Sequence, residues 1–133
     1  MPLILILEDF PADLRVAANI AQRAGFTEFE VTAFATDARK YLENAMDGKA
    51  PLPDAMIVDL DLGQESGFEL IRFWHKTLKT IPLIVWTVMG EQQREICALF
   101  GVNEFVHKED ENLLLESLST IVAAGMRTAQ RCG

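Results

Sequence analysis

Apolar residues form two uninterrupted runs of strand length, at residues 3–7 and 55–58. Each run ends abruptly in acidic residues: Glu8 and Asp9 follow the first run, and Asp59 follows the second. Continuous apolar runs of this length are typical of parallel strands that are buried on both faces of a sheet. We therefore predict that both strands deliver their carboxylates to one edge of a parallel sheet, the edge at which open α/β sheets bind ligands.

Strand and helix patterns alternate along the whole chain. Short apolar or alternating runs predict further strands at residues 29–34, 81–86 and 104–107. Pro11 suits a first helical turn, Thr36 can cap a second helix, and Gly25 can end the first. Helices with one apolar face are expected between and after the strands, at residues 10–24, 36–48, 68–74, 91–100 and 112–126.

The order of these elements defines the fold class. Each connection between strands is long enough for a helical crossover, which gives a parallel sheet with helices on both faces. We expect an α/β, flavodoxin-like, doubly wound (βα)5 sheet with strand order 2-1-3-4-5, in which strands one and three are neighbours. The length of 133 residues fits one domain, which we assign to residues 1–127, followed by a short tail at 128–133.

Composition and charge exclude several classes of protein. The formal net charge is −8 and the basic residues are scattered, which argues against a nucleic-acid-binding surface. The two cysteines, Cys97 and Cys132, lack the spacing of a zinc or redox site. The N-terminal apolar run is too short for a signal peptide or a membrane span, so we expect no membrane association and a cytoplasmic protein.

Polar residues stand at the ends of most predicted strands. Thr87 closes the fourth strand and Lys108 follows the fifth, in addition to the acids Glu8, Asp9 and Asp59. With strands one and three adjacent, the three acids converge at the switch point of the sheet. Like charges that close together repel each other unless a cation is present, so the three acids suit one divalent metal ion.

These residues resemble the receiver domain of two-component response regulators. The resemblance covers nearly the whole chain and is carried by residues in the order and spacing of that family. They are the acidic pair Glu8-Asp9, Asp59 with Ser66-Gly67 in the following loop, Thr87, Phe105 and Lys108.

The resemblance implies an acceptor and a metal. Asp59 would accept a phosphoryl group from a phosphohistidine on a histidine kinase or a histidine phosphotransfer protein. Mg²⁺ would be held by Asp9, Asp59, the backbone carbonyl of Asp61 and water, with help from Glu8. The chain would then act in signalling, not as an enzyme.

The resemblance also implies a switch. Lys108 and Thr87 would bind the phosphoryl oxygens, and Phe105 would turn inward once Asp59 is phosphorylated. The altered surface, on the fourth helix, fifth strand and fifth helix, would bind a downstream protein, or the phosphoryl group would be relayed onward. The oligomeric state and the identity of the partners stay open.

Some positions depart from the family pattern. Glu109 follows Lys108 where the family commonly has a cis proline, and Gly63 stands where proline is frequent. Val88 follows Thr87 where a smaller residue is usual, and we predict that it hinders access to Asp59 or slows the switch. Asp61 and Met89 occupy positions that, by the same resemblance, tune hydrolysis of the phosphoryl group.

Three other functions are possible for a chain with this pattern: a phosphatase, a flavin binder and a docking module. Residues 58–63 also look like the nucleophile motif of haloacid-dehalogenase-type phosphatases, with Asp59 as nucleophile and Asp61 as acid and base, but the motif lies in mid-chain without a later metal motif. A flavodoxin-like flavin binder would need Gly, Ser and Thr after the first strand. A receiver that serves only for docking is disfavoured by the intact set of site residues.

Overall fold

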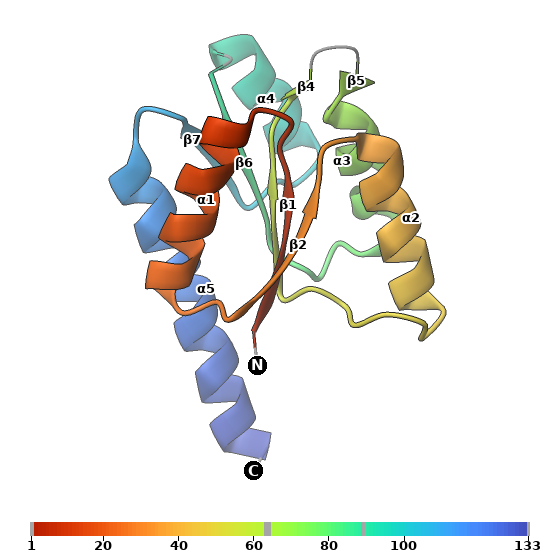
Figure 1. Ribbon diagram of the computed structural model, residues 1–133, viewed down its shortest axis with the longest axis vertical. Helices are drawn as coiled ribbons and strands as arrows, with labels where there is room; N and C mark the ends of the chain where they lie inside the picture. The colour runs from red at the N-terminus through yellow and green to blue at the C-terminus, as the bar shows by residue number, and fades with distance from the viewer. Residues whose placement is uncertain (1, 63–64, 89, 133) are drawn as a thin grey trace.

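The computed structural model describes residues 2–62, 65–88 and 90–132. Its main feature is a five-stranded parallel sheet in the order β2-β1-β3-β6-β7, which is the order predicted for the five main strands (Figure 1). The strands are β1 (Leu3–Leu7), β2 (Glu28–Thr32), β3 (Ala55–Val58), β6 (Leu83–Thr87) and β7 (Glu104–His107). The flavodoxin-like α/β fold is thereby confirmed.

Helices cover both faces of the sheet (Figure 1). One face packs against α1 (Pro11–Ala24) and α5 (Glu111–Cys132), through a core that includes Ile6, Ile57 and Trp86. The other face packs against α2 (Ala35–Met46), α3 (Phe68–Thr77) and α4 (Glu91–Leu99), through a core that includes Leu7, Val58 and Trp74. β1, β3 and β6 are apolar on both faces and occupy the centre of the sheet, as the uninterrupted apolar runs of β1 and β3 predicted for those two strands.

Two glycines let the chain change direction after a helix, and Gly25 is the one that the sequence analysis named. Gly25 ends α1 in the left-handed region at φ 118°, and its N–H donates to the carbonyl of Gln22. Gly101 follows α4 at φ 76° with the same kind of bond, to Ala98. Both glycines leave their helix without the steric cost that a Cβ atom would bring.

Three local details differ from the sequence prediction. Thr36 does not cap α2, because the helix begins one residue earlier: Ala35 is buried in the core, and Phe34 is the N-cap residue without a side-chain hydrogen bond. The last helix continues to Cys132, so described residues of the expected tail are helical. The chain from 123 to 131 is rich in strong helix formers, which explains the extension.

The third difference is a small antiparallel ladder in the predicted loop after β3. It is formed by β4 (Asp61–Leu62) and β5 (Glu65–Ser66). Strands of two residues leave no periodic signal in a sequence, which is why this ladder was not predicted. Gly63 and Met89, two positions of interest in the sequence, lie outside the described residues. Among the described residues, no helix combines the length and the apolar character needed to cross a bilayer.

Candidate functional site

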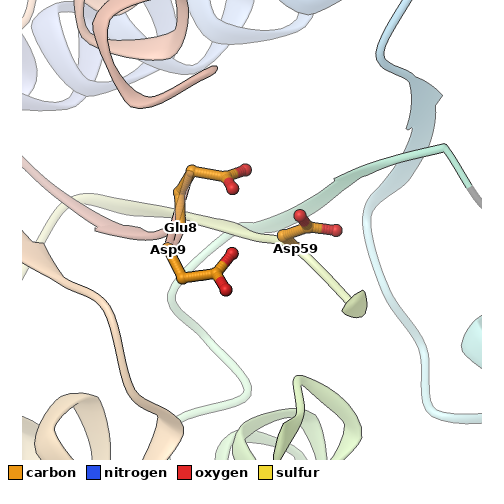
Figure 2. Close-up of side chains that lie close together, drawn as sticks. All are labelled: Glu8, Asp9 and Asp59. Atoms are coloured by element: carbon orange, nitrogen blue, oxygen red, sulfur yellow. The ribbon is translucent and has the colours of Figure 1, made fainter. Parts of the chain in front are cut away.

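The register of the central strands brings the predicted acids together. Leu7 of β1 pairs with Val58 of β3, so the residues that follow them, Glu8 and Asp59, leave the sheet side by side. The N–H of Asp59 donates to the carbonyl of Leu7 at 3.1 Å, which continues the ladder by one step. Figure 2 shows the side chains of Glu8, Asp9 and Asp59 gathered at this edge, and one oxygen of each lies within 4.8 Å of the others.

Burial separates the three acids. Glu8 and Asp59 are only 2% and 3% exposed, whereas Asp9 is open to solvent. Glu8 Oε1 accepts a hydrogen bond from the N–H of Phe10 at 3.0 Å, and Asp59 Oδ1 accepts one from the N–H of Asp61 at 3.1 Å. These backbone donors orient both carboxylates and offset part of the cost of burying them.

Lys108 supplies the opposite charge. Its Nζ lies 2.9 Å from Asp59 Oδ2, 2.8 Å from Glu8 Oε2 and 2.6 Å from Asp13 Oδ2. The backbone N–H of Lys108 donates to the carbonyl of Thr87 at 2.9 Å, which fixes the start of the side chain beside β6. The sequence predicted that Lys108 comes near Asp59, but it gave no role to Asp13.

Asp13 could have been found from its place in the chain. It lies in the first turn of α1, the helix that starts directly after the strand-end acids. An acid in a first helical turn is usually explained by its favourable interaction with the helix N-terminus. That explanation does not require a further partner, so the contact with Lys108 was not predicted. The first turn of α1 nevertheless starts at the same edge of the sheet as Lys108, which was the available signal.

Burial and charge shift two pKa values in this cluster. Burial raises the pKa of Glu8 to about 7, and the negative charge of Asp59 adds to that shift, while the ammonium of Lys108 opposes it. Burial alone would lower the pKa of Lys108, but its contacts with Asp13, Glu8 and Asp59 outweigh this effect and raise the pKa. Lys108 is therefore a permanent cation beside Asp59.

The donor set fits a hard divalent cation. Three carboxylates with oxygens within 4.8 Å of one another are the oxygen ligands that Mg²⁺ prefers. Glu8 Oε2 is buried and, among the described residues, accepts no well-directed hydrogen bond, although it lies 2.8 Å from Lys108 Nζ. Asp61 is exposed, and its carboxylate lies outside the described cluster. The metal contact predicted for its backbone carbonyl stays a prediction.

The predicted switch residues lie on the last two strands. Thr87 is fully buried at the end of β6, and Phe105 is 7% exposed on β7, with the guanidinium of Arg94 4.8 Å from its ring centre. Phe105 thus faces inward already in this structure. Val88, which follows Thr87, is exposed.

The loop after Lys108 has no proline, and the described residues contain no cis peptide bond. Glu109, which stands in the position of the commonly found proline, is exposed, and its N–H donates to Nδ1 of His107 at 3.2 Å. The turn after β7 is therefore closed by a local side-chain contact, and the N–H that a proline would lack takes part in it.

Comparison with known proteins agrees with this arrangement. The response regulator receiver domain family matches residues 4–119. The virulence transcriptional regulatory protein PhoP of Salmonella choleraesuis (strain SC-B67) is 31% identical over 106 residues, which make up 79% of this chain and 44% of PhoP. The chain therefore spans less than half the length of this curated relative. The chain belongs to the response regulator receiver domain family.

Solved structures share the fold. The Mn²⁺-bound form of the response regulator Rcp1 has a TM-score of 0.74 at 23% identity, with 91% of each chain covered. The phosphorylated cyanobacterial phytochrome response regulator RcpA has the same TM-score and identity, with 90% of each chain covered. Receiver domains of this family are signalling modules of two-component systems that in general bind Mg²⁺, histidine kinases and downstream targets. The family assignment favours this class over the phosphatase and flavin-binding readings.

Proposed function

We propose that this chain is a phospho-accepting receiver, in which Asp59 takes a phosphoryl group from a phosphohistidine in a reaction that depends on Mg²⁺. The observation that carries the proposal is the position of Lys108 Nζ, 2.9 Å from Asp59 Oδ2, beside three carboxylates that fit one divalent cation. A buried acid that is paired with a permanent cation and lies next to a metal site is arranged for nucleophilic attack on phosphorus.

The transfer step follows from the chemistry of the residues. A carboxylate oxygen of Asp59 attacks phosphorus, an O–P bond forms, and the N–P bond to the donor imidazole breaks with its electron pair left on nitrogen. Two anions must meet in this step, so positive charge lowers the barrier. Bound Mg²⁺ supplies part of that charge, and Glu8, Asp9 and Asp59 are the residues that would hold it.

Two further residues complete the proposed acceptor site. Lys108 Nζ lies 2.9 Å from Asp59 Oδ2, so its ammonium is placed to contact the oxygens of an incoming phosphoryl group. Thr87 ends the neighbouring strand β6 and offers a hydroxyl that can donate to the same oxygens. Rcp1 in a Mn²⁺-bound form and RcpA in a phosphorylated form are consistent with this chemistry in proteins of the same fold.

The proposed output is a changed surface on α4, β7 and α5. An aspartyl phosphate adds about −1.5 to −2 charges and new acceptor oxygens, which would draw Thr87 toward Asp59 and alter the packing behind it. Phe105 packs in the same core cluster as Cys97 of α4, so a movement of this side chain would be felt by that helix. A histidine kinase or phosphotransfer protein would load the site, in the cytoplasm that is typical of the family, and a downstream protein would bind the changed surface.

Acetyl phosphate provides the test. The protein is incubated with acetyl phosphate in Mg²⁺ or in a chelator, and the intact mass is followed with time. We expect a phosphoryl adduct that needs Mg²⁺ and is lost in Asp59→Asn. A wild-type chain that gains no adduct from any small phosphoryl donor contradicts the proposal and favours a docking module. Repeated turnover of phosphate monoesters would instead favour the phosphatase.

A further inference from the structure

We propose that Asp13 is a positioning residue for the phosphoryl acceptor site: it keeps the Lys108 ammonium beside Asp59 when a divalent cation is bound. The inference rests on the proposed function of Asp59. It assigns a task to a residue of α1 that the resemblance to receiver domains did not single out.

The contact between Asp13 and Lys108 is the shortest of the three that Lys108 makes with carboxylates. Lys108 Nζ lies 2.6 Å from Asp13 Oδ2, against 2.8 Å for Glu8 and 2.9 Å for Asp59. The Lys108 side chain is only 11% exposed, and that of Asp13 is 35% exposed. A charge-assisted hydrogen bond of this length at a largely buried ammonium is of the strong kind.

The three carboxylates that contact Lys108 differ in whether they would also bind the metal ion or the phosphoryl group. Glu8 and Asp59 belong to the cluster of three carboxylates that fits a divalent cation, and Asp59 is also the proposed acceptor. A carboxylate oxygen that ligates a metal ion, or that is esterified by a phosphoryl group, is a weaker partner for an ammonium. Asp13 lies outside the cluster described for Glu8, Asp9 and Asp59. Of the three carboxylates that contact Lys108, it is therefore the one that would neither ligate the metal ion nor accept the phosphoryl group.

Asp13 is therefore needed most when the site is loaded. A divalent cation next to Glu8 and Asp59 repels the Lys108 ammonium, since like charges at short range disfavour each other. The carboxylate of Asp13, 2.6 Å from the ammonium, attracts it and opposes that repulsion. Without Asp13, Lys108 would have to compete with the metal for the same two carboxylates.

The fold holds Asp13 and Lys108 in fixed places. Asp13 lies in the first turn of α1, where Leu14 N–H donates to the carbonyl of Phe10 at 2.9 Å and where Pro11 restricts the backbone. Lys108 Nζ also lies 5.3 Å from the ring centre of Trp86, which is buried on the face of the sheet covered by α1 and α5. The ammonium is thus held between an aromatic ring and carboxylates, and Trp86 can report on its position.

A double-mutant cycle tests whether Asp13 acts through Lys108. The rate of phosphorylation by acetyl phosphate at saturating Mg²⁺ is measured for wild type, Asp13→Ala, Lys108→Ala and the double variant. We expect Asp13→Ala to slow the reaction by roughly tenfold and to cause no further loss in the Lys108→Ala background. An unchanged rate in Asp13→Ala, or an equal loss in both backgrounds, overturns the proposal.

A second readout does not depend on the reaction. The indole N–H resonance of Trp86 is followed by NMR during a titration with Mg²⁺. We expect a larger shift of this resonance in Asp13→Ala than in wild type, and restoration by Asp13→Glu. Trp74 packs against the opposite face of the sheet and donates to Ile81 O at 2.7 Å, so its indole resonance serves as the internal control.

Asp37 provides the matched control variant. It is an exposed acid in the first turn of α2, so Asp37→Ala removes the same charge from the same kind of helix position. We expect this variant to behave like wild type in both experiments. If wild type gains no adduct, the proposed function fails, and the NMR titration still decides the role of Asp13: equal Trp86 shifts in wild type and Asp13→Ala contradict it.

Discussion

The backbone of Gly67 lies directly against the backbone of Asp59. A Cβ atom at Gly67 would overlap the carbonyl oxygen of Asp59 and would lie 3.0 Å from its carbonyl carbon. Gly67 has φ −62°, which any residue can adopt, so the close contact and not the dihedral angle requires glycine. This glycine is the N-cap residue of α3, and its close contact with Asp59 lets the chain before α3 return to the end of β3.

Gly67→Ala is therefore expected to destabilise the protein. The added methyl group meets backbone atoms, which cannot rotate away, so we expect a loss of about 1–3 kcal/mol in the free energy of unfolding. Gly90 is the N-cap residue of α4 and has open space where a Cβ would lie, so Gly90→Ala should change stability by less than about 0.5 kcal/mol. Urea denaturation of both variants measures the difference, and equal losses would contradict the account.

Removal of the Lys108 ammonium should be costly when no metal is bound. Lys108→Ala leaves the buried carboxylates of Glu8 and Asp59 without their cation, and breaking such a pair costs about 3–5 kcal/mol. We expect this loss in a chelator and a smaller loss in Mg²⁺, because a bound cation neutralises the same carboxylates. Lys40→Ala, at an exposed position of α2, is the control. A loss that Mg²⁺ does not reduce would argue against a metal site at these acids.

Stability without metal should depend on the ionisation of Glu8. The pKa of Glu8 is raised from 4.5 to about 7 in the folded chain, so the folded state binds this proton more tightly than the unfolded chain does. The contribution of Glu8 to stability is then full below pH 4.5 and decreases as the pH rises toward 7. We expect wild type to lose stability relative to Glu8→Gln over this interval, as measured by urea denaturation in a chelator. If the difference in free energy of unfolding between wild type and Glu8→Gln stayed constant across these pH values, ionisation of Glu8 would not affect stability.

Mg²⁺ itself should stabilise the fold through Asp9. A ligand that binds only the folded state at about 100 times its Kd adds about 2.7 kcal/mol of stability, which raises the melting temperature. Asp9 is the exposed member of the cluster, so Asp9→Asn should remove most of this gain with little effect on the metal-free protein. Scanning calorimetry with and without Mg²⁺ measures both effects. An equal gain in Asp9→Asn would exclude Asp9 as a ligand.

The sequence predicted the sheet because its signals are strong and local. Apolar runs such as residues 3–7 and 55–58 are stable at the centre of a parallel sheet that helices cover on both faces. The register of these two strands then makes Glu8 and Asp59 neighbours. Lys108 was predicted on the same logic, because it follows the last strand at the same edge. These predictions depend on backbone topology alone.

Other features depend on contacts that a sequence does not display. The start of α2 is decided by burial of Ala35, which overrides the capping preference of Thr36. The pair formed by β4 and β5 is too short to leave a pattern. Asp13 and Lys108 are 95 positions apart in the chain, so the sequence indicates that both lie at this edge of the sheet but not that they are in contact.

The location of the phosphoryl group decides whether Asp59 is the acceptor. After reaction with acetyl phosphate and Mg²⁺, borohydride reduces an aspartyl phosphate to homoserine, and peptide mass spectrometry identifies the residue. We expect conversion at Asp59 in wild type and in Asp61→Asn, and no conversion at any residue in Asp59→Asn. Phosphoryl found on another residue of the wild-type chain, or retained in Asp59→Asn, would contradict it.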